Sequence, residues 1–243
     1  MQHEMNPLGQ PVGQLVPNWL PPALPARAPM QGRFCRIEPL EPARHAVDLY
    51  RANLADQEGR NWTYLPYGPF ANFDDYHTWL DQSATASDPL FFAIIDLKTN
   101  KAVGVCSYLR IDPRHGSIEV GHLNFSPLLQ AKPAATEAMY LMMERAFDLG
   151  YRRYEWKCHT LNLPSRRAAT RLGFQLEGIF RQAAVYKGRS RDTAWYSIID
   201  SEWPALNVVF QNWLARENFD NDGQQKSSLS KMTSQFRNDY QNA

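Results

Sequence analysis

The stretch Glu119-Val-Gly-His-Leu-Asn-Phe-Ser-Pro-Leu-Leu-Gln-Ala-Lys-Pro-Ala-Ala-Thr-Glu-Ala-Met139 predicts a strand, a short loop and a helix in direct succession. Pro133 suits the first turn of that helix, where a missing N–H costs little. An apolar stripe then recurs at helical spacing, at Ala135, Met139, Met142, Met143 and Ala146. The loop amides lie at the positive end of the helix dipole and would suit a phosphate group. Every helix start has such amides, so this stretch alone identifies no ligand.

A second unit of strand, loop and helix follows in the segment Tyr151-Arg-Arg-Tyr-Glu-Trp-Lys-Cys-His-Thr-Leu-Asn-Leu-Pro-Ser-Arg-Arg-Ala-Ala-Thr-Arg-Leu-Gly-Phe174. Gly173 suits the C-cap of its helix, because glycine adopts the left-handed conformation required there. Two such units in this order are much more specific than either one alone.

The flanking residues extend the pattern in both directions. Residues 33–40 predict a strand, and helices follow from Pro42 and over 74–84. Strands are then expected over 90–96, 102–111 and 117–125. After the second unit, two further strands precede a helix from Glu202 to about Arg216. The order of elements predicts a mixed α/β (α+β) domain around one central sheet.

The two ends of the chain differ in composition from its middle. Residues 1–30 contain seven prolines, which exclude a continuous helix or a central strand and predict an extended arm. Trp19, Leu20 and Leu24 suggest that this arm is laid over the core. Residues 218–243 are polar and predict a loose C-terminal tail. We therefore divide the chain into an arm (1–30), a domain (31–217) and a tail (218–243).

Composition narrows the class of protein. With 44% hydrophobic residues and a net charge of +1, the chain can build a core and has no long-range attraction for nucleic acid or an anionic membrane. No window approaches the roughly 20 apolar residues of a membrane span, and the first residues do not form a signal peptide. Cys35, Cys106 and Cys158 are isolated, which indicates reduced thiols without a disulfide or a metal site. A cytoplasmic enzyme is expected.

Together the two units resemble the GNAT acyltransferase superfamily, and within it the RimJ/RimL-like branch. The resemblance rests on a strand ending in an apolar pair, a loop led by Gln130, the pattern Asn162-x-x-Ser165 and a helix closed by Leu-Gly-Phe. The runs Glu177-Gly-Ile-Phe-Arg and Lys187-Gly-Arg-Ser-Arg-Asp-Thr-Ala-Trp-Tyr-Ser-Ile fit the same branch. The resemblance covers about residues 33–205. It implies a mostly antiparallel central sheet, flanked by helices and splayed between its fourth and fifth core strands.

The resemblance also implies acetyl-CoA as the acyl donor. The backbone of the splayed strand would bind the pantetheine arm like a missing strand, and the loop after it would bind the pyrophosphate. The cofactor-binding residues implied are Leu123, Asn124, Phe125, Gln130, Ala131, Lys132, Ala134, Ala135, Asn162 and Ser165. Asn162 would alternatively be an ordinary helix N-cap. Pro133 replaces the first glycine of the family's loop, so one amide donor is lost and weaker pyrophosphate binding is the risk.

Acyl transfer to an amine needs a proton acceptor, a donor for the leaving thiolate and stabilisation of the charge on the carbonyl oxygen. Glu119 is the candidate base, unless it is an ordinary strand carboxylate. Ser165 is the candidate donor to sulfur, unless its hydroxyl only satisfies backbone amides. A backbone amide near His122 and Leu123 would bind the oxyanion. Transfer would be direct, within a ternary complex.

The aromatic segment with Trp62, Tyr64 and Tyr67 lies where the family places its acceptor-binding loop, and it would either bind an amine or simply pack. The acceptor would be a protein N-terminus or a small amine. A homodimer is possible, as is common in the family. Four further residues lie close to these motifs: Arg166, Arg167, His122 and His159. Arginine on a helix and a lone histidine more often lie on the surface or pack in the core than take part in catalysis. The altered loop leaves one alternative, a non-catalytic module that senses acyl-CoA or binds another protein.

Overall fold

The main sheet of the molecule has eight strands. The computed structural model describes residues 4–241 and places these strands in the order β3-β4-β5-β6-β7-β8-β10-β9. All neighbouring pairs are antiparallel except β7 and β8, which are parallel. The strands are β3 (Met30–Gln31), β4 (Cys35–Pro39), β5 (Leu90–Asp96), β6 (Lys101–Asp112), β7 (Ser117–Phe125), β8 (Arg153–His159), β9 (Gln175–Tyr186) and β10 (Arg189–Ile199). The predicted mixed α/β class with a mostly antiparallel sheet is confirmed.

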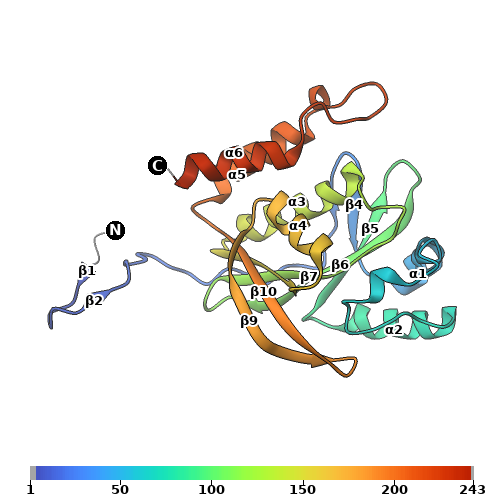
Figure 1. Ribbon diagram of the computed structural model, residues 1–243, viewed down its shortest axis with the longest axis horizontal. Coiled ribbons are helices and arrows are strands. Elements are labelled where there is room, and N and C mark those ends of the chain that lie inside the picture. The colour runs from blue at the N-terminus through green and yellow to red at the C-terminus, as the bar shows by residue number, and fades with distance from the viewer. Residues whose placement is uncertain (1–3, 242–243) are drawn as a thin grey trace.

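Helices cover both faces of this sheet. On one face, α1 (Pro42–Asn53), the short 3₁₀ helix η1 (Arg60–Trp62) and α2 (Phe73–Thr85) lie beside β5 and β6. On the other face lie α3 (Pro133–Asp148), α4 (Leu163–Arg171) and α5 (Trp203–Leu214) (Figure 1). Strand β5 separates the two layers, because Phe91, Ala93 and Ile95 face the first group and Phe92 and Ile94 the second. Burial on both faces explains why the sequence of β5 is an almost continuous apolar run.

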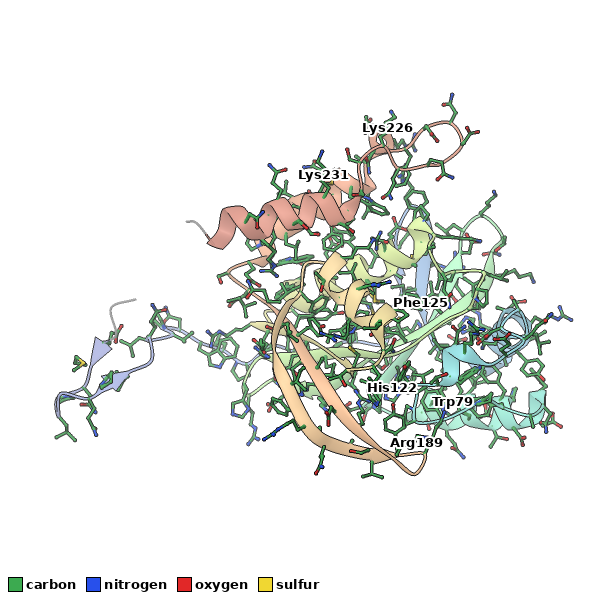
Figure 2. The ribbon with its side chains drawn as sticks, in the orientation of Figure 1. Trp79, His122, Phe125, Arg189, Lys226 and Lys231 are labelled. Atoms are coloured by element: carbon green, nitrogen blue, oxygen red, sulfur yellow. The ribbon has the colours of Figure 1, made fainter. Side chains whose placement is uncertain are left out.

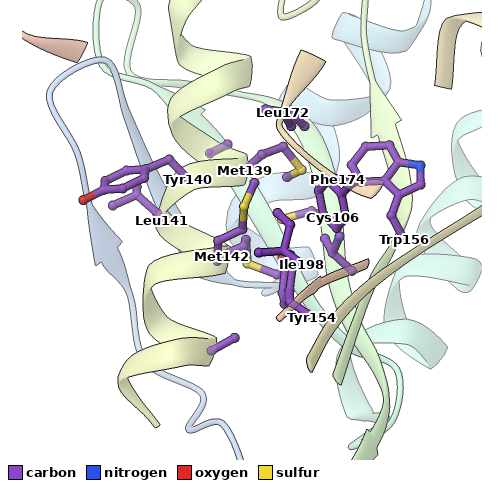
Figure 3. Packing of buried hydrophobic residues seen from close by; sticks show 14 of the residues in the cluster. Cys106, Met139, Tyr140, Leu141, Met142, Tyr154, Trp156, Leu172, Phe174 and Ile198 are labelled. Carbon is purple, nitrogen blue, oxygen red and sulfur yellow. The ribbon is translucent and has the colours of Figure 1, made fainter. Parts of the chain in front are cut away.

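The larger core lies between the sheet and α3. Met139, Met142 and Met143 are almost fully buried there, so the predicted stripe of this helix is its core face. Figure 3 shows Met139 and Met142 on the side of α3 that faces Tyr154 of β8 and Ile198 of β10. The three cysteines are free and buried, and Cys158 packs in this core as a small apolar side chain.

The sheet opens between β7 and β8, its fourth and fifth core strands. Residues 117–120 of β7 pair with residues 153–156 of β8, and the ladder ends at Val120 and Trp156. Beyond this point β7 continues to Phe125 and β8 to His159 without pairing to each other. The splay implied by the family resemblance is therefore present.

The expectation of a loose tail after residue 217 is wrong. The 3₁₀ helix η2 (Arg216–Asn218) leads to α6 (Leu229–Gln241), which packs on α4 and α5. Leu229, Thr233 and Phe236 are buried, and Thr233 Oγ1 donates to the carbonyl oxygen of Arg171 at the end of α4 (3.1 Å). The spacing of these three residues is helical, but the polar composition around them conceals it. Residues 242–243 lie outside the described residues.

The N-terminal arm is extended, but it follows the core only in its second half. Residues 4–18, with the two-stranded hairpin of β1 (Glu4–Met5) and β2 (Pro11–Val12), project from the domain (Figure 1). Trp19 then packs where the side chain of Arg152 lies over its ring (5.4 Å). Leu20 and Leu24, expected to cover the core, are 80% and 66% exposed, whereas Pro22 and Pro25 are the buried residues of this stretch. Residues 1–3 lie outside the described residues. Among the described helices, none combines the length and the apolar character that crossing a bilayer requires.

Candidate active site

A bulge in β7 marks the point where the sheet opens. Gly121 pairs with Ser107 and Asn124 with Val105, so β7 has one residue more than β6 between these pairs. His122 takes up the extra length with a positive φ of 50°. A bulge leaves its extra residue outside the ladder and bends the strand. The predicted oxyanion donor, an amide near His122 and Leu123, therefore lies at the distortion that opens the sheet.

Glu119 lies just before the bulge, on the face of the sheet opposite α3. Its side chain is buried, and its Oε2 accepts from Arg110 Nη1 (2.7 Å) and from Lys157 Nζ (2.9 Å). Burial raises the pKa of Glu119, because the charged form loses water, while Lys157 and Arg110 lower it in opposition. The carboxylate is thus an ion-paired group beside the bulge rather than an ordinary exposed strand residue.

Ser165 lies on the other face of the sheet, in the first turn of α4. Its Oγ accepts a hydrogen bond from Trp156 Nε1 (3.0 Å), and its amide donates to Asn162 Oδ1 (3.2 Å). Asn162 therefore is the N-cap of α4, which was one of its two predicted roles. Because the Ser165 oxygen accepts from Trp156, the hydroxyl proton remains able to donate to another group.

The loop before α3 presents few amides. The amides of Gln130, Lys132 and Ala135 donate to carbonyl oxygens within the loop. Within the described part of the chain, the amides of Ala131 and Ala134 have no backbone acceptor, and Ala131 has a positive φ of 58°. Pro133 occupies the first turn of α3 as predicted and supplies no N–H. This loop therefore offers fewer free backbone N–H groups to an anion than the glycine-containing loop that is usual in the resembled family.

Two observations bear on the fit of acetyl-CoA to the splayed strand. Asn124 is 2% exposed, and its amide nitrogen and oxygen have no hydrogen-bond partner within the described part of the chain. An orphaned buried amide favours a ligand or water that completes it. The carbonyl oxygen of Phe125, in contrast, already accepts from Gln130 Nε2 (2.7 Å) and Asn61 Nδ2 (3.2 Å). A ligand would have to displace one of these donors to use Phe125.

The predicted acceptor segment forms an aromatic cluster beside the bulge. Tyr67 stacks on the ring of His122 (5.6 Å, 7° between planes), and its hydroxyl lies 3.2 Å from His122 Nδ1. Burial lowers the pKa of His122 to about 4, so the imidazole is neutral at pH 7. In Figure 2, His122 lies close to Trp79, a residue of α2 whose ring packs on Tyr67 (4.5 Å between centroids). Trp62 is only 5% exposed and lies beneath this surface as part of the core.

Two contacts tie the aromatic segment to the far side of the opening. The hydroxyl of Tyr64 donates to the carbonyl oxygen of Leu161, in the loop between β8 and α4 (3.1 Å). Lys187, at the tip of the β9–β10 hairpin, donates to the carbonyl oxygens of Trp62 (2.8 Å) and Tyr67 (3.2 Å). The aromatic segment, the hairpin tip and the β8–α4 loop thus contact one another around the open end of the sheet.

Sequence reasoning placed Tyr67 in a different segment from Glu119 and His122, and the structure brings Tyr67 onto the ring of His122. It missed Arg110, Lys157 and Glu155, which surround Glu119. A signal was present, because Arg153, Glu155 and Lys157 alternate along β8 and alternate residues share one face of a strand. Arg166 donates to the hydroxyl of Tyr196 (3.2 Å), and His159 accepts from the amide of Leu161 (3.1 Å). Both side chains are therefore held by hydrogen bonds within the protein.

A mostly antiparallel sheet that opens where β7 leaves β8, with helices on both faces, is the architecture of the GNAT acetyltransferase fold. A family model of the acetyltransferase (GNAT) domain matches residues 35–175. The chain belongs to the GNAT family of N-acetyltransferases.

Solved and curated relatives agree with this assignment. The crystal structure of a GCN5-related N-acetyltransferase from Brucella melitensis has 49% sequence identity, covers 90% of this chain and 100% of its own, and superposes with a TM-score of 0.88. An uncharacterized N-acetyltransferase p20 of Bacillus licheniformis is 31% identical over 46% of this chain. The ribosomal-protein-serine acetyltransferase of Escherichia coli K12 is 31% identical over 43% of this chain. The matches span 63% and 59% of the lengths of these two curated relatives.

Proposed function

We propose that this protein transfers an acetyl group from acetyl-CoA to a primary amine, directly and within a ternary complex. The observation that carries the proposal is the bulge at His122, where β7 leaves β8 with the buried carboxylate of Glu119 next to it. The thioester of acetyl-CoA supplies the activated acetyl group. The remaining chemistry falls to residues of this chain.

Leu123 and Asn124 would bind the pantetheine arm, since they follow the bulge. The side-chain amide of Asn124 also has no hydrogen-bond partner in the described part of the chain. The amides of Ala131 and Ala134 would receive the pyrophosphate, with Lys132 and Ala135 beside them and Asn162 nearer the thiol end. Gln130 and Phe125 belong to the same site only if the hydrogen bond between them opens. This internal bond and the missing N–H of Pro133 would both weaken pyrophosphate binding relative to the family's loop.

Glu119 would accept the proton that the amine loses, either directly or through a water molecule. The amide beside His122 would stabilise the charge that develops on the acetyl oxygen. Burial raises the pKa of Glu119, which makes its carboxylate a better proton acceptor, while Lys157 and Arg110 stabilise the charged form in opposition.

Ser165→Ala should slow transfer by about 10-fold to 100-fold, because the departing sulfur loses its hydrogen-bond donor. The helix start should survive, since the cap is made by Asn162 and not by the hydroxyl of residue 165. Single-turnover rates with the variant would check this, beside unfolding curves of both proteins. A variant with the wild-type rate would return Ser165 to a purely structural role.

The acceptor would approach over Tyr67 and Tyr64, with Trp62 supporting them from below. Aromatic rings suit an alkylammonium group before it loses its proton. Both acceptor classes remain within the proposal, a protein N-terminus and a small amine. The named relative that acetylates a ribosomal-protein serine favours testing peptides that begin with serine first. Reduced cysteines and use of acetyl-CoA are consistent with work in the cytoplasm.

Thermal unfolding with and without acetyl-CoA tests the first half of the proposal, with ATP and NAD as controls. Ligand at 100 times its dissociation constant should stabilise the fold by about 2.7 kcal/mol, which raises the midpoint by several degrees. Thiol release in the presence of amines and peptides tests the second half. A shift with acetyl-CoA but no release of CoA thiol with any amine would favour the non-catalytic module. No shift with acetyl-CoA would exclude both the acetyltransferase and a module that senses acyl-CoA.

A further inference from the structure

We propose that Lys157 positions Glu119, by binding one carboxylate oxygen so that the other faces the bulge where the amine would react. The inference rests on the proposed function, in which Glu119 accepts the proton of the amine. It concerns a residue that does not itself touch the reacting atoms.

Lys157 is held on three sides. Its ammonium lies 2.9 Å from Glu119 Oε2, 2.7 Å from Glu155 Oε2 and 3.7 Å from the centroid of the Trp195 ring. The side chain is 7% exposed. Two carboxylates and an aromatic face match the donor directions of an ammonium group and compensate for its burial. The ammonium group of Lys157 is therefore fixed in position.

Both cations that contact Glu119 bind the same oxygen, Oε2. The other oxygen, Oε1, lies 3.6 Å from the point where a Cβ on Gly121 would stand. A Cβ at position 121 would come within 2.8 Å of Leu109 Cδ2, so the leucine side chain would have to shift to admit it. Oε1 is therefore turned toward bare backbone directly before His122. Arg110 alone would hold the carboxylate less firmly, since its side chain is 61% exposed.

The charges around the pair define what removal of Lys157 would do. Glu155, the partner of Glu119 across the β7–β8 ladder, also accepts from Arg153 Nε (2.6 Å), and Arg153 in turn binds Glu177 of β9. Arg110 faces Glu119 from β6, and its backbone amide is bound by Asp88 (2.9 Å). His122 is neutral. Without Lys157, the carboxylates of Glu119 and Glu155 would face each other, and repulsion would favour protonation of one of them.

Two substitutions should therefore move the pH profile in opposite directions. Lys157→Met removes the cation, so the pKa of Glu119 rises and the acid limb of kcat should move up by about one pH unit or more. Glu155→Gln removes the second carboxylate that binds Lys157, so Lys157 stabilises the charged form of Glu119 more strongly. The pKa of Glu119 should then fall, and the acid limb of kcat should move to lower pH. At a pH below the limb, Lys157→Met should then cost at least about tenfold in kcat, with little change in the KM for acetyl-CoA. The ionisation of the amine is the same in every comparison, because one acceptor is used throughout.

Arg237→Met is the matched control, because it breaks a buried ion pair of similar character with Glu202, on the far side of the core. It should cost stability and leave the pH profile unchanged. A Glu119 carboxyl titration by carbon-13 NMR, assigned with Glu119→Gln, gives the same comparison without any acceptor. Folding of each variant is checked by circular dichroism, and Glu155→Gln keeps the test open if Lys157→Met does not fold.

The outcomes separate the two levels of the proposal. Opposite shifts in kcat and in the NMR titration support the positioning role. Wild-type turnover with unmoved limbs in Lys157→Met and Glu155→Gln would overturn that role and leave the acetyltransferase proposal standing. If no amine accepts an acetyl group from the wild-type protein, the proposed function fails, and an NMR titration that also stays unmoved would show that Lys157 does not control Glu119.

Discussion

Glu119→Gln is expected to lower the rate of acetyl transfer by about 100-fold or more, while the affinity for acetyl-CoA changes little. Glutamine has almost the same shape as glutamate but cannot accept the proton of the amine. It can still accept hydrogen bonds from Arg110 and Lys157 through its amide oxygen, so the surroundings of residue 119 should stay in place. Single-turnover rates over a range of pH, with acetyl-CoA binding measured by calorimetry, check both halves of the expectation.

The pH dependence supplies the sharper control for this variant. In the wild-type protein the rate should fall as pH drops through the pKa of Glu119, because the base becomes protonated. The carboxylate form is required, so activity is present above that pKa and lost below it. In Glu119→Gln this acid limb should disappear. An unchanged rate and an unchanged limb would remove Glu119 from the mechanism, and the neutral His122 would be the next base to test.

Trp62→Ala is expected to destabilise the fold by about 3–5 kcal/mol and to raise the KM for the amine. Trp62 is nearly fully buried and packs edge-on against Phe70 (5.4 Å) and Tyr67 (6.3 Å). Gly68 also lies against it, since a Cβ at 68 would come within 2.5 Å of the indole. Loss of the indole would leave Tyr67 without its support. Denaturant unfolding and steady-state kinetics with one fixed acceptor measure the two effects.

Phe210→Ala is the matched control for stability, because Phe210 is a fully buried aromatic residue of the other core. It should cost a similar free energy of unfolding and leave the KM for the amine unchanged. Trp62→Phe should restore most of the KM, since it keeps an aromatic ring beneath Tyr67. If Trp62→Ala raises no KM beyond that of Phe210→Ala, the segment around Trp62 is not part of the acceptor site.

Local patterns allowed most of the fold to be predicted. The strands over 90–96 and 117–125 have the predicted bounds, and Pro133 begins α3 as expected. Helix α6 was missed, because Leu229, Thr233 and Phe236 are few among polar neighbours and become a core face only against α4 and α5. The arm was predicted to be extended, but which of its side chains are buried depends on the surface beneath it.

The candidate site could be predicted only where one segment carries it. Ser165 and Asn162 are three residues apart, so their cap was readable from spacing. Lys157 and Glu119 are 38 residues apart in the numbering, and their ion pair depends on the register of β7 with β8. The Gln130 side chain was expected at the pyrophosphate, but it binds Phe125 and Asn61, a contact that the loop sequence does not contain.

The sequence by itself determined the two successive units of strand, loop and helix, and with them the family, because helix starts, apolar stripes and turns depend on neighbouring residues. The tertiary structure alone decided which charges surround Glu119, which oxygen they bind and how the aromatic segment closes over the bulge. These contacts join residues from separate strands and loops, and their distances are set by strand register and packing.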